Sequence, residues 1–303
     1  MYVVMRGDES YGRNWGYYCL QDAFRDVFDG GNITESNVLQ SILSGSADSS
    51  LYRTKLLASY EGGFVNGGTC QLTRPNFFIV PQGRCAEALL FSTLMSVILD
   101  EQQIDRASRP IIISNGFFDT TAANASATGF ELQTFTQPGL TDPFPSHLIG
   151  KKNPFKGNLD IEACEAFFAG NTRRVAMILI TITNNWAAGQ PVSMANIRDA
   201  ALLAKRLGIP LLFDACRFAE NAYFIHQYEE GYSRINISEI VQEMFSHVDG
   251  FTISLKKDGL ANMGGVLSLR DKGCLAQQYD SIGHRLKERQ ILCYGNDSYG
   301  GSM

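Results

Sequence analysis

Polar residues that could bind a charged ligand or move a proton follow four separate apolar runs of this sequence. They are Gln82, Gly83 and Arg84 after the run at 77–80, Asn185 after the run ending at 183, Asp214 and Arg217 after the run at 210–213, and Ser254, Lys256 and Lys257 after the run at 251–253. In an open α/β sheet, ligands bind outside the carboxyl ends of the strands. If the runs are strands of one such sheet, these residues share one edge of it.

The chemistry open to this set is activation of a bound pyridine ring. Asp214 could hold a ring nitrogen protonated, which makes the ring an electron sink. Lys257 could form a Schiff base if burial or a neighbouring cation, such as Lys256 or Arg217, keeps its amine deprotonated. This combination of a carboxylate and a lysine suits pyridoxal 5′-phosphate (PLP).

The phosphate and the ring faces of PLP also have candidate partners. The helix expected after residues 82–84 would offer free N–H groups and a positive dipole to a phosphate, and Ser254 could add a hydroxyl. Phe117 or Phe118, after the apolar run at 111–114, could stack on the ring. Taken alone, each of these features has a structural explanation: a turn, a solvated lysine pair or a core phenylalanine. The hypothesis therefore depends on their joint placement.

The elements that must position these residues alternate along the chain from residue 77. Strands are expected at 77–80, 110–114, 175–183, 209–213 and 250–255, and helices at 86–99 and 193–207. Ser193 is a good N-cap for the second helix, and Gly208 a natural end. Continuous apolar strands separated by helices predict an α/β fold with a mainly parallel sheet and helices on both faces.

The chain divides into three regions by composition. Residues 1–30 place Tyr17, Leu20, Phe24 and Phe28 at helical spacing, which predicts a short helical lead-in. Residues 31–76 are rich in glycine and serine and are interpreted as an insertion. Residues 77–303 are predicted to form the large ligand-binding domain.

Composition limits the possible partners and compartment. The 303 residues carry a net charge of −5 and a pI near 5.4, which argues against nucleic acid or an anionic membrane as the main partner. The seven scattered cysteines include no C-x-x-C pair, so a disulfide framework or a zinc site is not expected and a reducing cytoplasm is favoured. No apolar run is long enough for a transmembrane helix.

Several long motifs resemble those of the β-eliminating lyases, the family of tryptophanase and tyrosine phenol-lyase. They lie at 7–11, 82–84, 118–121, 155–157, 185–193, 214–225, 254–258 and 262–265, in the family's order. The resemblance covers most of residues 5–30 and 77–301. It implies the large domain of PLP fold type I and a homotetramer, a dimer of dimers, with active sites shared between subunits.

The resemblance implies individual roles. Lys257 would form the Schiff base, Asp214 would pair with the pyridine nitrogen and Phe118 would stack on the ring. Further implied cofactor contacts are Asn185 and Arg217 with the 3-oxygen, Gln82, Gly83 and Ser254 with the phosphate, and Lys256 and Arg84 beside them, Arg84 also as a catalytic residue lining the site. Tyr11 would assist departure of the aromatic ring, and Glu9 and Asn262 would bind a monovalent cation, usually potassium.

The implied reaction is α,β-elimination of an aromatic amino acid to pyruvate and ammonia. Asp119 favours L-tryptophan, because a carboxylate can accept the indole N–H where tyrosine phenol-lyases carry a threonine. Residues 257–265 are closer to the phenol-lyases, so L-tyrosine is the alternative. Two further alternatives are an inactive PLP-binding fragment or paralogue, and a PLP enzyme of another reaction, such as an aminotransferase or a cysteine lyase.

The sequence departs from the family in three respects. It begins near the motif at 7–11 and ends at 303, so we expect it to lack the C-terminal small domain and the arginine there that binds the substrate carboxylate. The region 31–76 is interpreted as an insertion. Ala122 stands where the family usually has an arginine.

Overall fold

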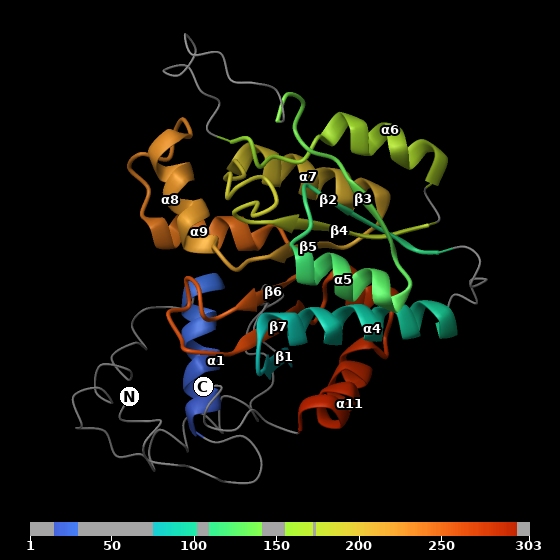
Figure 1. Cartoon of the computed structure of the whole chain (residues 1–303). Helices are drawn as coiled ribbons and strands as arrows, with labels where there is room; N and C mark the ends of the chain where they lie inside the picture. Colours follow the sequence, from blue (N-terminus) through green and yellow to red (C-terminus); the bar gives the residue numbers. More distant parts are fainter. Residues whose placement is uncertain (1–14, 30–74, 102–108, 141–154, 172–173, 296–303) are drawn as a thin grey trace, which may run out of the picture.

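The computed structural model describes residues 15–29, 75–101, 109–140, 155–171 and 174–295. Within these ranges a sheet of seven strands runs through the molecule in the order β1-β7-β6-β5-β4-β2-β3 (Figure 1). The strands are β1 (Pro75–Val80), β2 (Ile111–Ser114), β3 (Glu131–Thr134), β4 (Val175–Thr181), β5 (Leu211–Asp214), β6 (Gly250–Ser254) and β7 (Gly265–Arg270).

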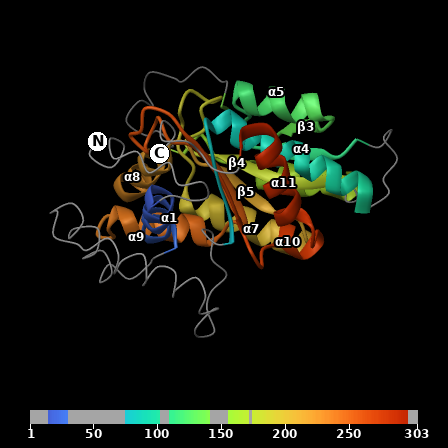
Figure 2. The ribbon, with the colours of Figure 1, turned by 90° about the horizontal axis from the view of Figure 1, so that it is seen from below.

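Helices cover both faces of the sheet, and each face has its own apolar core. One core involves α1 (Trp15–Phe28), α6 (Ile161–Asn171), α7 (Met194–Leu207), α8 (Phe218–Tyr228) and α9 (Ile237–Ser246). The other involves α4 (Gly83–Glu101), α5 (Asp119–Thr128), α10 (Cys274–Gln278) and α11 (Ile282–Tyr294). Figure 2 shows α1 and α9 on one side of the sheet and α4 and α11 on the other. Alternate strand residues enter opposite cores: Phe77 and Ile79 the first, Phe78 and Val80 the second.

Strand direction brings the expected strand ends to one edge. Strands β2 to β6 pair in parallel, whereas β7 is antiparallel to both β6 and β1. Strand β1 therefore runs in the same direction as β6. The prediction of a mainly parallel sheet covered by helices on both faces is confirmed.

Local signals for the helix after residue 193 match the structure. The Ser193 hydroxyl accepts the N–H of Asn196, and Gly208 ends α7 in the left-handed conformation with φ +66°. Of the lead-in residues, Tyr17, Phe24 and Phe28 on α1 are buried in the first core. Most of the insertion predicted at 31–76 lies outside the described residues, and its last two, Pro75 and Asn76, belong to β1.

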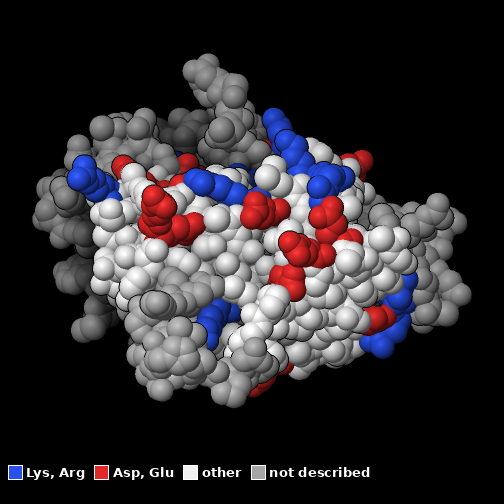
Figure 3. All heavy atoms as spheres, turned by 90° about the horizontal axis from the view of Figure 1, so that it is seen from above, with Lys and Arg blue, Asp and Glu red and all other residues white. Residues whose placement is uncertain are grey.

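Two properties of the described residues bear on partners. None of their helices has the length and apolarity that crossing a bilayer requires. On the face shown in Figure 3, acidic and basic side chains are interspersed, with no continuous basic field.

Candidate active site

The turn from β1 into α4 packs directly against the end of β6. A Cβ on Gly83 would lie 2.7 Å from the Cβ of Ser254, so only glycine permits this approach. A Cβ on Gly265 would lie 2.5 Å from the Gly83 nitrogen, which makes the turn tight from the β7 side as well. The first N–H groups of a helix have no partner inside it and attract anions. The start of α4, with the buried Ser254, can therefore hold a phosphate.

Asp214, the last residue of β5, presents a carboxylate at the same edge. It is 4% exposed, and the Cys216 thiol donates a hydrogen bond to its Oδ1 at 3.1 Å. Burial raises the pKa of Asp214, while the thiol and the nearby charges of Lys257 and Arg217 oppose that rise. A buried carboxylate of this kind is stabilised by a protonated ring nitrogen, which supplies both a charge and an N–H donor.

Lys257 lies in the turn after β6 and faces an aromatic ring from another element. Its Nζ is 5.7 Å from the centre of the Phe118 ring. Phe118 is half-buried at the start of α5, whereas Phe117 is buried in the core. Of the two phenylalanines considered from sequence, Phe118 has the position suited to stacking on a ring next to Lys257.

The turn that carries Lys257 is anchored to the next helix by its neighbour Asp258. The Asp258 carboxylate accepts the backbone N–H groups of Ala219 and Glu220 at 2.7 and 3.1 Å. It thereby caps the start of α8, to which Arg217 is the preceding residue. The lysine turn and the Arg217 segment are thus fixed to each other.

The other candidate residues differ in their surroundings. Arg217 and Asn185 are half-buried, and Gln82, Arg84, Asp119, Lys256 and Asn262 are exposed. In the described part of the chain, no hydrogen bond or ion pair joins any of these exposed residues to Asp214 or Lys257. Glu9 and Tyr11 lie outside the described residues. The structure thus brings together Gly83 with Ser254, and Asp214 and Phe118 with Lys257.

Glu87, Cys216 and Asp258 were not singled out as site residues from sequence. Glu87 is 5% exposed, and burial followed by the charge of Asp214 raises its pKa. Its signal was a carboxylate inside the apolar segment of α4, at a position expected to be buried. The Ser254 N–H donates to the Cys216 sulfur at 3.3 Å, and Asp258 caps α8. Both contacts join the segment after β5 to the end of β6 or the turn after it, and no local pattern reports that approach.

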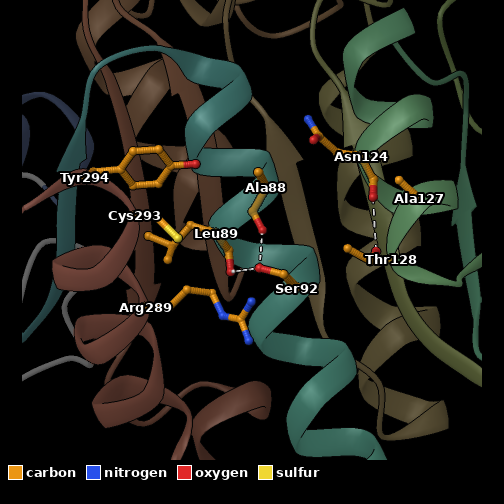
Figure 4. Close-up of a pocket in the computed structure, with 9 residues that line it drawn as sticks. All are labelled: Ala88, Leu89, Ser92, Asn124, Ala127, Thr128, Arg289, Cys293 and Tyr294. Carbon is orange, nitrogen blue, oxygen red and sulfur yellow. Dashed lines mark hydrogen bonds between the residues drawn. The ribbon is translucent and has the colours of Figure 1, made fainter.

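A small cleft of about 180 Å³ lies elsewhere, between α4, α5 and α11 (Figure 4). The Ser92 and Thr128 hydroxyls in its lining donate to carbonyls of their own helices. None of the residues predicted for the site lines this cleft.

The residues at the sheet edge fit PLP. The close approach of Gly83 sets Ser254 beside the α4 N-terminus, which suits a phosphate, and the buried Asp214 suits a pyridine nitrogen. The charge of Lys257 influences Asp214, and its Nζ faces the Phe118 ring. Such an arrangement can bind an aromatic phosphorylated aldehyde and supply an amine beside it.

Comparison with known proteins gives the relatives of this chain. The family model described as beta-eliminating lyase matches residues 1–300. A tryptophanase of Salinibacter ruber is 36% identical over 298 residues, covering 93% of this chain and 56% of that protein. A tryptophanase of Rhodobacter capsulatus is 41% identical over 225 residues, covering 74% and 44%. This chain spans about half the length of these curated relatives.

Among solved structures, Oryza sativa TDC with PLP and tryptamine matches with a TM-score of 0.47 and 13% identity. The match covers 73% of this chain and 45% of that one.

Proposed function

Because this chain belongs to the β-eliminating lyase family, we propose that it binds PLP and takes part in the β-elimination of an aromatic amino acid. The preferred substrate is L-tryptophan, which would give indole, pyruvate and ammonia. The observation that carries the proposal is the meeting of Lys257, Asp214 and Phe118 at the edge where the α4 N-terminus approaches Ser254.

Each residue has a task in this proposal. PLP, when bound, supplies an electron sink for the charge that develops at the substrate Cα. Asp214 keeps the proton on the ring nitrogen, and the low exposure of its carboxylate strengthens that pairing. The Lys257 amine removes the proton from Cα. Phe118 covers one face of the ring and excludes water there.

The substrate preference is supported by Asp119, the first residue of α5, directly after Phe118. Its carboxylate is exposed and can accept the indole N–H. Tyrosine, with phenol as the leaving group, is the alternative substrate because residues 257–265 are closer to the phenol-lyases. Tyr11 is proposed to assist departure of the ring.

The proposal extends to the surroundings of the site. Glu9 and Asn262 are proposed to bind potassium, and the chain is proposed to act as a homo-oligomer, a dimer of dimers. A reducing, cytoplasmic compartment is proposed because the scattered cysteines of the sequence include no C-x-x-C pair. Gln82, Arg84, Asn185, Arg217 and Lys256 are proposed to complete the cofactor contacts.

Borohydride reduction of the PLP-loaded chain, followed by peptide mapping, tests the proposal. It should leave the cofactor on Lys257, and Lys257→Ala should abolish both this label and the visible absorbance of lysine-bound PLP. The control is Lys205→Ala, an exposed lysine on α7, which should leave both unchanged.

Pyruvate release from tryptophan and from tyrosine then identifies the substrate. Release from tryptophan alone supports the preferred reading, and release from tyrosine alone supports the alternative. Label on Lys257 without pyruvate from either substrate would leave a PLP-binding chain without turnover. Absence of label would refute the proposal.

A further inference from the structure

A buried carboxylate on α4 holds the beginning of α5. Glu87 accepts three hydrogen bonds, and all three donors belong to α5. Thr121 Oγ1 donates at 2.6 Å, Thr120 Oγ1 at 2.9 Å and Asn124 Nδ2 at 3.1 Å. Hydrogen bonds are stronger in a buried site away from water, and here three donors converge on one carboxyl group.

The beginning of α5 packs against α4 but has little polar support apart from Glu87. Its N-cap residue is Phe118, which offers no side-chain acceptor, and only Thr121 and Ala125 are buried along its ten residues. Helices of this length are marginal without packing. Helix α7 shows the contrast, because it has the Ser193 cap and six buried residues. Besides its packing on α4, helix α5 therefore depends on the Glu87 hydrogen bonds to hold its first turns.

The two ends of α5 are anchored separately. At the end away from the site, Gly129 adopts a left-handed conformation with φ +107°, and Arg109 donates to the carbonyls of Gly129 and Phe130 at 2.9 and 2.8 Å. At the other end, the Glu87 hydrogen bonds hold the first two turns. Removal of these bonds should loosen the helix near the site and leave its far end in place.

The loosened end is the one that carries two candidate site residues. Phe118 faces Lys257, and Asp119 follows it at the exposed first position of the helix. We propose that Glu87 is a positioning residue: it fixes the first turns of α5, and through them the Phe118 ring and the Asp119 carboxylate. What Phe118 and Asp119 do rests on the proposed function, whereas the anchoring of α5 does not.

A matched pair of substitutions separates hydrogen bonding from charge and volume. Glu87→Met keeps nearly the length and volume of the side chain but removes its ability to accept the three bonds. Glu87→Gln is also uncharged, yet its amide oxygen can still accept from Thr120 and Asn124 while its NH₂ group donates to the Thr121 hydroxyl. If Glu87 acts by positioning α5, Glu87→Gln should keep the order of the first turns of α5 that Glu87→Met loses.

Hydrogen exchange measured without cofactor tests the anchoring. In Glu87→Met, the amides of residues 122–125 should exchange at least about tenfold faster than in the wild type, which corresponds to about 1.4 kcal/mol. Exchange within α7 should be unchanged, and Glu87→Gln should stay within about threefold of the wild type. Thr121→Val, which removes the shortest bond from the α5 side, should show an intermediate acceleration and serves if Glu87→Met does not fold.

The bound cofactor tests the consequence for the site. The visible circular dichroism of bound PLP reports how rigidly its ring is held, and Glu87→Met should reduce it and raise the PLP dissociation constant about tenfold, with rescue by glutamine. Equal exchange rates in all variants would overturn the anchoring. Faster exchange with an unchanged dichroism would overturn the positioning role. If the wild type binds no PLP, the proposed function is refuted, but the exchange comparison still decides whether Glu87 anchors α5.

Discussion

Replacement of Gly83 by alanine tests the geometry on which the proposed phosphate site depends. The new Cβ would lie 2.7 Å from the Cβ of Ser254 and 3.0 and 3.2 Å from its Cα and nitrogen. Carbon atoms in contact normally lie about 3.5–4.0 Å apart. Two of the three contacted atoms are backbone, so no side-chain rotation relieves the contact. The start of α4 and the end of β6 must therefore separate by about 1 Å.

The added methyl group should have two effects: overpacking lowers the stability of the chain, and displaced N–H groups weaken the proposed phosphate contacts. Forcing a methyl group into a packed site costs about 1–3 kcal/mol, so the free energy of unfolding of the cofactor-free chain should fall by that amount. A hydrogen bond to a charged group contributes about 1.5–3 kcal/mol. Misalignment of even one N–H with the phosphate should therefore weaken PLP binding roughly 10- to 100-fold.

Gly170→Ala is the matched control. Gly170 lies in α6, and an added Cβ there would meet nothing within 4 Å. This variant should be as stable as the wild type or more stable by up to about 1 kcal/mol, with unchanged PLP binding. Urea unfolding gives the stabilities, and titration with PLP followed by absorbance gives the affinities. If Gly83→Ala unfolds at the same urea concentration as Gly170→Ala and binds PLP equally well, the close approach to Ser254 is not what forms the phosphate site.

Two further substitutions probe the carboxylates around Lys257. Burial raises the pKa of Asp214 in the folded chain, so the native state holds this proton more firmly than the unfolded state. The stability of the cofactor-free chain should therefore fall as the pH rises from the ordinary carboxyl range through the raised pKa. Asp214→Asn should remove that part of the pH dependence. In urea unfolding, its stability relative to the wild type should therefore increase as the pH rises above the ordinary carboxyl range, and its PLP binding should weaken. A stability difference that stays constant across the pH series would contradict the assignment. Asp258→Ala removes the acceptor for the Ala219 and Glu220 N–H groups and should lower stability by about 1–2 kcal/mol. Because the same carboxylate anchors the turn of Lys257, borohydride should also trap less PLP on the lysine, and full trapping would show that the turn holds its position without this cap.

The sequence predicts those parts of the fold that local patterns encode. Each apolar run between polar residues became a strand, and the Ser193 cap and Gly208 end gave the bounds of α7. Helix α5 was not predicted because its alanines, threonines and single buried turn give no apolar periodicity. Strand β7 was not predicted either, since it begins in a glycine pair and gives no separate signal from the segment before it.

The same distinction separates the site residues that the sequence predicts from those that it does not. Asp214, Ser254 and Lys257 could be found because a polar residue directly after an apolar strand is visible in the sequence. Glu87 was missed because its partners belong to another helix, and Cys216 because its contact with the Ser254 N–H joins segments 38 residues apart. The Glu87 carboxylate meets Thr121, 34 residues away, only when α4 and α5 pack side by side.

The two antiparallel pairings of β7 bring Lys257 and the turn from β1 into α4 to the same edge of the sheet. Because β7 returns antiparallel to β6, the segment 255–264 begins and ends at the same edge of the sheet, and Lys257 stays there. The second antiparallel step, from β7 to β1, brings the end of β1 back to this edge, where the Gly264 N–H donates to the Pro81 carbonyl at 2.9 Å. With parallel pairing in either step, the Gln82–Gly83 turn would lie at the opposite edge. The same two strand pairings thus hold Lys257 and the proposed phosphate-binding turn at a fixed separation.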